Sequence, residues 1–200
     1  KWTTATNWFG NAVPGASDVA HFNNLCTNCS ATIDASISVE GIQMMDGYTG
    51  TIAQGAGNTI TLNNFGFLQE SGVFAGGNSQ FDTNSFVVTG GTFNATSAET
   101  QVLGTGAITI GDDATFNHSS GSFTIAGSGN RTFTAQVAGT TFNNLNFTNG
   151  GASDSVITIV NDINAANLVF NTDAGANTEK FNGGSIHVTN SLVATRVDGG

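Results

Sequence analysis

Short runs with apolar side chains at alternate positions recur along most of the chain. Residues 60–62, 86–88 and 108–110 are examples, with Ile, Leu, Val or Phe at their first and third positions. Side chains of a β-strand point alternately to its two faces, so this period of two predicts strands with one buried face. Strong helix formers are scarce, and β-branched and aromatic residues are common. The pattern therefore predicts an all-β fold.

These strands belong to a repeating unit. A strand, a small-residue corner, a second strand bearing Phe and a polar corner begin at residues 60, 86 and 108, which are 26 and 22 positions apart. The corners are Gly, Asn or Asp, which tolerate positive φ. A repeat of about 22 residues is typical of a solenoid coil. Looser copies follow at residues 123–133, 142–147, 156–160, 168–170, 186–188 and 192–194.

Stacking such units predicts a parallel β-solenoid of about seven or eight coils, with strands about 4.8 Å apart. Ile, Leu, Val and Phe are expected inside, and Thr, Asn, Ser and Gln outside. The alternative is an antiparallel sandwich or barrel, which also has short strands and frequent turns. Hairpin dipeptides are few, with Asp46-Gly47 and Asn149-Gly150 as the candidates, and this favours the solenoid.

The N-terminal block has a different character. Both Trp residues and the single Pro fall within the first fourteen positions. An open solenoid end exposes apolar core and unpaired strand edges, which large aromatic side chains can cover. We predict an N-terminal cap and disulfide loop over residues 1–30 and solenoid coils over residues 31–200, in one continuous domain. Trp2, Trp8 and Phe22 are the capping candidates, and glycan stacking is their alternative role.

The two cysteines, Cys26 and Cys29, are separated by two residues. A thioredoxin-type pair needs a helix that the sequence does not predict, and a zinc site needs a second pair of ligands. A disulfide that closes a loop in an exported protein needs nothing further. We therefore predict a Cys26–Cys29 disulfide and an extracellular location.

Charge is sparse and acidic. Four Lys and Arg residues stand against fourteen Asp and Glu, and Gly, Thr, Asn and Ser make up 95 of the 200 residues. So few basic residues cannot form a phosphate-binding patch, which argues against nucleic acid as a partner. The sequence has no basic amphipathic stretch that would bind a membrane surface. It also has no apolar run long enough to cross a membrane.

Catalytic chemistry has little support in the sequence. His187 alternates with apolar neighbours and is expected to point outward, and His118 lies in a polar corner. Asp112 and Asp113 form an adjacent acidic pair at a corner. They can form a turn, act as the two carboxylates of a glycosidase, or bind Ca²⁺ weakly. We predict no catalytic residues and no cofactor, with Ca²⁺ at Asp112 and Asp113 as a weak candidate.

Ice binding would require ranks of outward Thr on one flat face. Thr59-Ile60-Thr61 and Thr132-Phe133-Thr134 fit this locally. Among the aligned repeats, however, Thr109 is matched by Val87, so the rank is broken. Ice binding is kept as a second alternative.

The opening Trp, Asn-Trp and Val-Pro-Gly-x-x-Asp-x-Ala-x-Phe pattern, and the Thr-Phe-Asn-Asn-Leu-Asn-Phe-Thr-Asn run at residues 141–149, resemble bacterial secreted β-helix surface proteins of the autotransporter-passenger and filamentous-haemagglutinin-like kinds. The resemblance covers nearly the whole chain and is compositional. It implies a right-handed parallel β-helix used for display, adhesion or fibre building, and it supplies no catalytic residues.

These observations together predict an extracellular structural or adhesive β-solenoid module of a bacterial surface protein or fibre. Its expected partners are other copies or neighbouring modules of the same protein, and surface glycans. The principal alternative is a carbohydrate-binding or carbohydrate-active β-helix.

Overall fold

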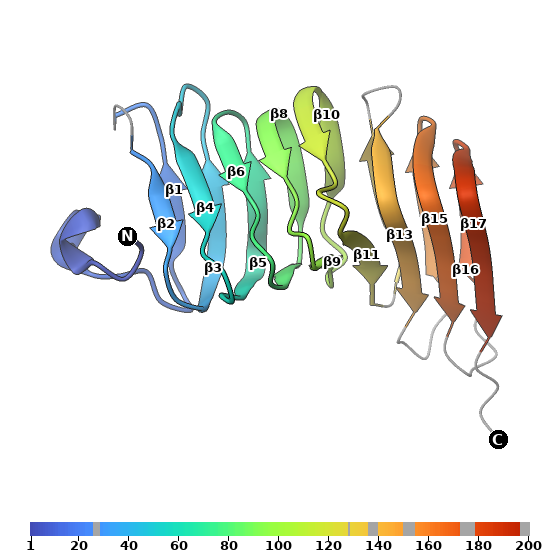
Figure 1. The fold of residues 1–200 in the computed structure, drawn as a ribbon, viewed down its shortest axis with the longest axis horizontal. Helices are drawn as coiled ribbons and strands as arrows, with labels where there is room; N and C mark the ends of the chain where they lie inside the picture. The colour runs from blue at the N-terminus through green and yellow to red at the C-terminus, as the bar shows by residue number, and fades with distance from the viewer. Residues whose placement is uncertain (26–28, 128, 136–139, 150–154, 173–178, 197–200) are drawn as a thin grey trace.

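The computed structural model describes residues 1–25, 29–127, 129–135, 140–149, 155–172 and 179–196. The chain winds about seven times around one axis, and strands make up about 60% of it (Figure 1). Two short 3₁₀ segments, η1 (Ala5–Asn7) and η2 (Phe9–Asn11), precede the strands. The strands are β1 (Val19–Phe22), β2 (Ala31–Ile33), β3 (Ile37–Met44), β4 (Thr51–Gln54), β5 (Ile60–Gln69), β6 (Val73–Ala75), β7 (Phe81–Thr83), β8 (Phe86–Asn94), β9 (Glu99–Val102), β10 (Ile108–Asn117), β11 (Ser122–Ala126), β12 (Arg131–Ala135), β13 (Thr141–Asn149), β14 (Ser155–Val160), β15 (Ile163–Thr172), β16 (Glu179–Gly183) and β17 (Ile186–Arg196).

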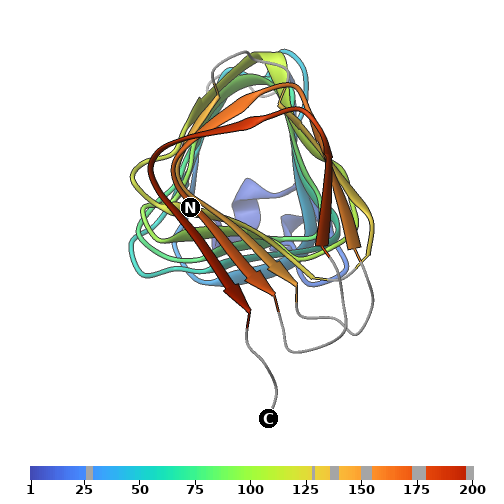
Figure 2. The same cartoon turned by 90° about the vertical axis from the view of Figure 1, so that its right-hand side faces the viewer.

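The coils have three sides, which Figure 2 shows end on. Face 1 contains β1, β12, β14, β16, the last parts of β3 and β5, and the first parts of β8 and β10. Face 2 contains β7, β9, β11, the first parts of β3 and β5, and the last parts of β13, β15 and β17. Face 3 contains β2, β4, β6, the last parts of β8 and β10, and the first parts of β13, β15 and β17.

Every pairing among the described strands is parallel. Strands within the stack bond to the strand one coil earlier and to the strand one coil later on the same face, as β8 does with β5 and β10. This confirms the predicted all-β parallel solenoid and excludes the antiparallel sandwich. The long strands β5 and β8 each turn a corner, so a single strand contributes to two faces.

The interior is a continuous column of apolar side chains, as the alternating pattern predicts. Phe74 and Phe93 stack with ring centroids 5.0 Å apart, and Phe86 lies edge-on to Phe93 at 4.9 Å. In-register parallel pairing places equivalent positions of successive coils above one another, and each buried Phe removes about 150–250 Å² from water. Stacking of coils is therefore the main source of stability.

One part of the predicted repeat alignment is wrong. Ile60 lies on face 2 and pairs with Phe81, whereas Phe86 lies on face 1 and pairs with Phe67, so residues 60 and 86 are not equivalent. Residues 86 and 108 are equivalent, because Ile108 pairs with Phe86. A coil contains three strand-and-corner units, so the local pattern recurs within each turn and does not identify the face.

Corners and the outer surface use neutral polar groups. Gly66 has a φ of +66°, and a Cβ atom there would collide with the Ser85 carbonyl of the next coil. On the outer surface, Asn167 Nδ2 donates to Asn144 Oδ1 at 2.8 Å, and Asn190 Nδ2 donates to Asn167 Oδ1 at 2.7 Å. Amides can stack in this way between coils where like charges would repel, which accounts for the scarcity of charge.

Candidate functional site

The N-terminal end of the solenoid is closed by a cluster of aromatic rings. Trp2 is only 1% exposed, and its backbone N–H donates to the Thr32 carbonyl of β2 at 2.7 Å. Trp8 Nε1 donates to the Trp2 carbonyl at 2.7 Å, and the two indole rings meet edge to face with centroids 4.7 Å apart. Phe22 and Tyr48 extend the cluster into the first coil, with centroids 5.6 Å apart. These four residues form the aromatic cap.

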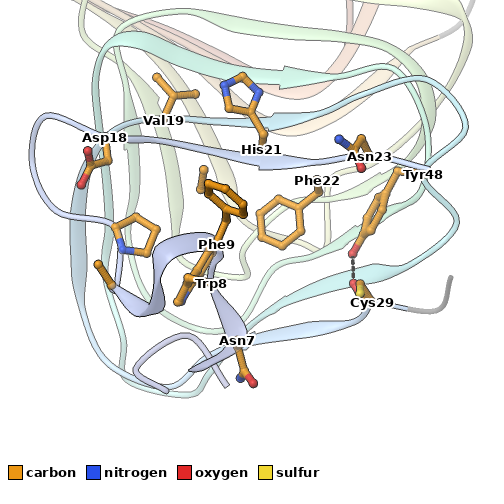
Figure 3. Close-up of a pocket in the computed structure, with 13 residues that line it drawn as sticks. Asn7, Trp8, Phe9, Asp18, Val19, His21, Phe22, Asn23, Cys29 and Tyr48 are labelled. Carbon is orange, nitrogen blue, oxygen red and sulfur yellow. Dashed lines mark hydrogen bonds between the residues drawn. The ribbon is translucent and has the colours of Figure 1, made fainter. Parts of the chain in front are cut away.

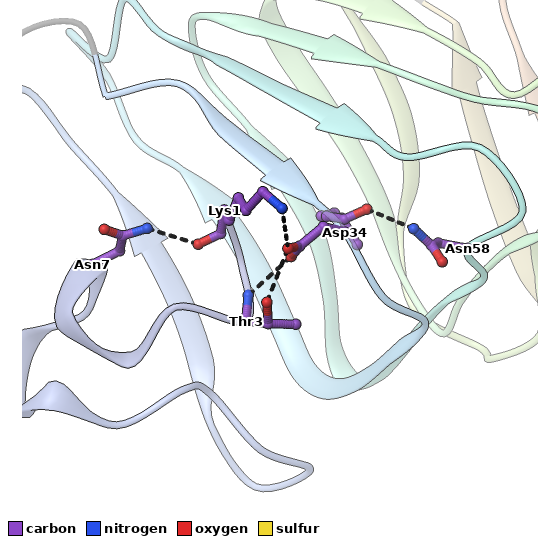
Figure 4. A network of polar contacts seen from close by, with 6 residues as sticks. Lys1, Thr3, Asn7, Asp34 and Asn58 are labelled. Carbon is purple, nitrogen blue, oxygen red and sulfur yellow. Dashed lines mark hydrogen bonds and ion pairs between the residues drawn. The ribbon is translucent and has the colours of Figure 1, made fainter.

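A polar network ties the start of the chain to β2 (Figure 4). Asp34 accepts hydrogen bonds from the Thr3 backbone N–H at 3.0 Å and from Thr3 Oγ1 at 2.9 Å, and Lys1 Nζ lies 3.7 Å from its Oδ2. The Thr3 backbone bond is the main cause of a lowered pKa for the Asp34 carboxyl. Because the ionised form is the one that accepts these bonds, the network holds at neutral pH.

A hollow of about 480 Å³ lies between the 3₁₀ segments and β1 (Figure 3). Trp8, Phe9 and Tyr48 supply aromatic surface, and Asp18 and His21 supply polar groups. A second hollow of about 430 Å³ adjoins it, since Asn7, Trp8, Phe22 and Cys29 line both.

Tyr48 closes one side of the larger hollow. Its hydroxyl donates a short hydrogen bond to the Cys29 carbonyl, and burial raises its pKa to about 12. At neutral pH the phenol is therefore protonated and donates this bond. Together with the half-buried Trp8, its ring supplies aromatic surface to the wall of the hollow.

The predicted capping residues all contribute to this end of the molecule. Trp2 is enclosed by protein, and Phe22 is 9% exposed at the boundary of the cap and β1. Trp8 retains exposed surface beside both hollows. Of the two Trp side chains, only Trp8 offers a ring surface to a ligand without movement of the cap. Glycan stacking, if it occurs, would rest on Trp8.

The remaining predicted site residues lie elsewhere. Cys26 lies outside the described residues, so its disulfide with Cys29 stays a prediction. Asp112 and Asp113 are exposed where β10 turns from face 1 to face 3. No three His, Cys, Asp or Glu side chains gather in a metal-binding group within the described part of the chain. The Ca²⁺ candidate is thus a pair of carboxylates without further acidic partners there.

The three histidines stand apart from one another in the fold. His21 is exposed beside the larger hollow, and His187 is exposed on β17, outward as predicted. His118 Nδ1 accepts a hydrogen bond from the Ser120 backbone N–H at 2.9 Å, so it serves a local turn.

The structure also brings together acidic residues that the sequence analysis missed. Asp82 on β7 and Glu99 on β9 interact on the outside of face 2. Burial and then the Glu99 charge raise the pKa of the Asp82 carboxyl, while Gln80 Nε2 donates to Asp82 Oδ1 at 2.9 Å and opposes this effect. Glu99 accepts a hydrogen bond from Thr124 Oγ1 at 2.5 Å. Only the pairing of coils makes these residues neighbours.

Outward Thr residues form short ranks. On face 1, Thr109 pairs with Thr134, and Val87 and Val160 occupy the next positions on either side. A further rank on face 3, which the sequence analysis did not identify, contains Thr92 paired with Thr115. Neither rank is long and uninterrupted.

The C-terminal end is open in the described structure. Leu192 on β17 pairs with Leu168 on β15, which in turn pairs with Leu145 on β13. These three side chains occupy one interior column, yet Leu145 and Leu168 are 0% and 4% exposed, whereas Leu192 is 63% exposed. Apolar interior surface is therefore presented at this end.

No helix among the described residues has the length and apolar character of a membrane span. No family model, curated protein or solved structure matches the chain. The resemblance to bacterial surface β-helix proteins stays a prediction, and the geometry of the two ends carries the functional argument.

Proposed function

We propose that the chain is a structural and adhesive β-solenoid module of a bacterial surface protein or fibre, located outside the cell. It acts by display and by self-association or docking with neighbouring modules. Catalysis and a bound cofactor have no part in this proposal. The single observation that carries it is the contrast between the two ends of the apolar column, which Trp2 seals at the N-terminal end and which Leu192 leaves exposed at the C-terminal end.

The open end favours association for two reasons. Leu192 occupies an interior position without a further coil above it among the described residues, so covering it would remove apolar surface from water. The backbone groups on the outer edge of β17 are also available, because β17 pairs only with β15 in the described structure. An exposed edge of this kind is a template for further strands.

The composition of the outer surface is consistent with a module that is displayed on a cell or fibre. It is covered by Thr, Asn and Ser, and its charges are few and scattered. Parallel coils keep such side chains at a regular spacing, which supports display along a rod. Surface glycans are further proposed partners.

A matched pair of substitutions at the open end tests the proposal. Leu192→Lys places a charge in the interior column, whereas Val193→Lys places the same charge on the outer surface of the same strand. Sedimentation velocity of the unmodified chain over a range of concentrations should show association. Leu192→Lys should abolish it and Val193→Lys should retain it, with circular dichroism as the control for folding. A monomer at all concentrations, or equal loss in both variants, would contradict association through this end.

Carbohydrate binding is the second candidate, and the half-exposed Trp8 beside the two hollows favours it. Aromatic rings flanked by polar groups such as Asp18 and His21 are suited to sugar rings. A glycan array should then show binding that disappears in Trp8→Ala. Binding that persists in this variant would place any glycan site elsewhere on the solenoid.

A further inference from the structure

Within the part of the chain that the structure describes, the first strand of face 1, β1, is hydrogen-bonded along one edge only, to β3. The carbonyls of Asp18 and Phe22 accept hydrogen bonds from the backbone N–H groups of Glu40 and Met45, on the side of β3. Successive residues of a strand direct their backbone groups to opposite edges. Val19 and His21 therefore direct their N–H and C=O groups away from β3.

The cap does not cover this second edge. On face 3, the N–H of Trp2 donates to Thr32 and so closes the outer edge of β2. On face 1, the 480 Å³ hollow lies in the corresponding place, and all six residues from Asp18 to Asn23 line it. The hollow thus follows the whole length of β1, from one end of its unpaired edge to the other.

The walls of the hollow complement this backbone edge. Trp8 and Phe22 lie on its inner side with ring centroids 5.8 Å apart, and the fully exposed Phe9 stands beside them (Figure 3). These rings would contact side chains that point inward from a strand laid along β1. The exposed His21 side chain and the Asp18 carboxylate mark its outer side.

We propose that the free edge of β1 binds an extended peptide segment of a partner protein by β-strand addition. The backbone of the peptide pairs with the N–H and C=O groups of Val19 and His21, and apolar side chains at alternate positions pack against Trp8 and Phe22. This mode of recognition derives affinity from main-chain bonds and selectivity from alternate side chains. A saccharide would use the aromatic wall and lacks the regular spacing of donors and acceptors that a strand edge offers. The site is independent of association at the C-terminal end.

The test uses a fluorescein-labelled synthetic peptide that carries residues 106–111 between two lysines. In the protein, this stretch contains the face 1 strand at the start of β10, with Ile108 and Ile110 pointing inward. Fluorescence anisotropy should show saturable binding. Amide hydrogen exchange should show Val19 and His21 exchanging rapidly in the free protein and slowly in the complex, whereas Ala20 is protected in both.

Two variants at one position separate backbone from side-chain recognition. His21→Pro removes the N–H donor from the free edge and keeps the bonds to β3, since proline is tolerated in an edge strand where its nitrogen faces away from the sheet. It should weaken binding about tenfold, as expected for the loss of a main-chain hydrogen bond. His21→Ala keeps the donor and should bind within about twofold of the unmodified chain.

Modified peptides give the same test without altering the protein. N-methylation of single residues along the peptide should divide the positions into two alternating classes, one that binds and one that is weakened about tenfold. Absence of peptide binding, equal effects of all N-methylations, or equal loss in His21→Ala and His21→Pro would overturn the proposal. Displacement of the peptide by chitohexaose, with protection lost at Val19 and His21, would assign the hollow to saccharides instead.

Discussion

The two ends of the solenoid terminate the same apolar column in different ways. At the N-terminus, Trp2 is 1% exposed and seals the column, and its backbone also closes the edge of β2. At the C-terminus, Leu192 is 63% exposed above a buried Leu168. Each coil of a solenoid contacts only its neighbours, so the stability of a terminal coil depends on what covers its outer side.

The largest effect should come from the residue that seals the column. Trp2→Ala is expected to reduce the free energy of unfolding by about 3–5 kcal/mol, because it leaves a large cavity under the cap. Leu192→Ala removes a mostly exposed side chain and should cost less than about 1 kcal/mol. Urea denaturation of both variants measures the difference. Equal losses would mean that the C-terminal end is covered in solution.

A smaller effect is expected at the junction between the cap and the first coil. Tyr48→Phe removes the hydroxyl that bonds to the Cys29 carbonyl, and should cost about 1–2 kcal/mol. The pKa of Tyr48 is raised from 10.0 to about 12, so its contribution is complete below pH 10 and is lost as the pH rises through about 12.

The pH dependence of denaturation checks this junction separately from packing. The unmodified chain should lose stability between pH 10 and about 12, and Tyr48→Phe should lack this part of the slope. An identical slope in both proteins would show that the Tyr48 phenol does not couple the cap to the coil.

Asp82 lies in the middle coils, away from both ends, and a substitution there should change the free energy of unfolding less than one at the cap. The raised pKa of Asp82 means that its neutral form suits the folded state, so its contribution is complete below the ordinary value of 3.8 and falls as the carboxyl ionises at higher pH. Asp82→Asn should therefore stabilise the chain at neutral pH by no more than about 1 kcal/mol, since solvent screens a partly exposed group. Thermal denaturation, with the exposed Asp113→Asn as control, measures this. A loss of stability in Asp82→Asn would show that the carboxylate is needed in its charged form.

The smallest effect should be local to the start of the chain. The lowered pKa of Asp34 means that its contribution is present above the ordinary value of 3.8 and is lost as the pH falls below it. Acidification should accelerate hydrogen exchange at the Thr3 amide before that at the Trp2 amide, which donates to the Thr32 carbonyl at the same end of the fold. Asp34→Asn should show rapid exchange at Thr3 already at neutral pH. Unchanged protection would mean that Trp2 alone anchors this segment.

Much of the architecture could be predicted from the sequence. The alternation at residues 60–62 and 108–110 correctly identified strands with one buried side, and small polar residues and glycine, such as Asn63, Asn64 and Gly72, marked corners. The early Trp residues indicated a covered end. These features depend on each residue and its immediate neighbours, which is why a local pattern reveals them.

The assignment of strands to faces could not be predicted with the same success. Residues 60 and 86 carry the same local pattern but lie on different faces, because the length of each corner sets how far the chain has turned. The proximity of Asp82 to Glu99 has the same origin.

The sequence by itself determined that this chain is a parallel solenoid with apolar side chains inside, neutral polar side chains outside and an aromatic N-terminal end. Only the tertiary structure decided which strands stack, which carboxylates meet, and that the cap closes β2 while leaving a hollow along β1. The physical reason is that inward or outward orientation follows from the two-residue period of a strand. Register and edge coverage, in contrast, depend on contacts between residues about twenty positions or more apart.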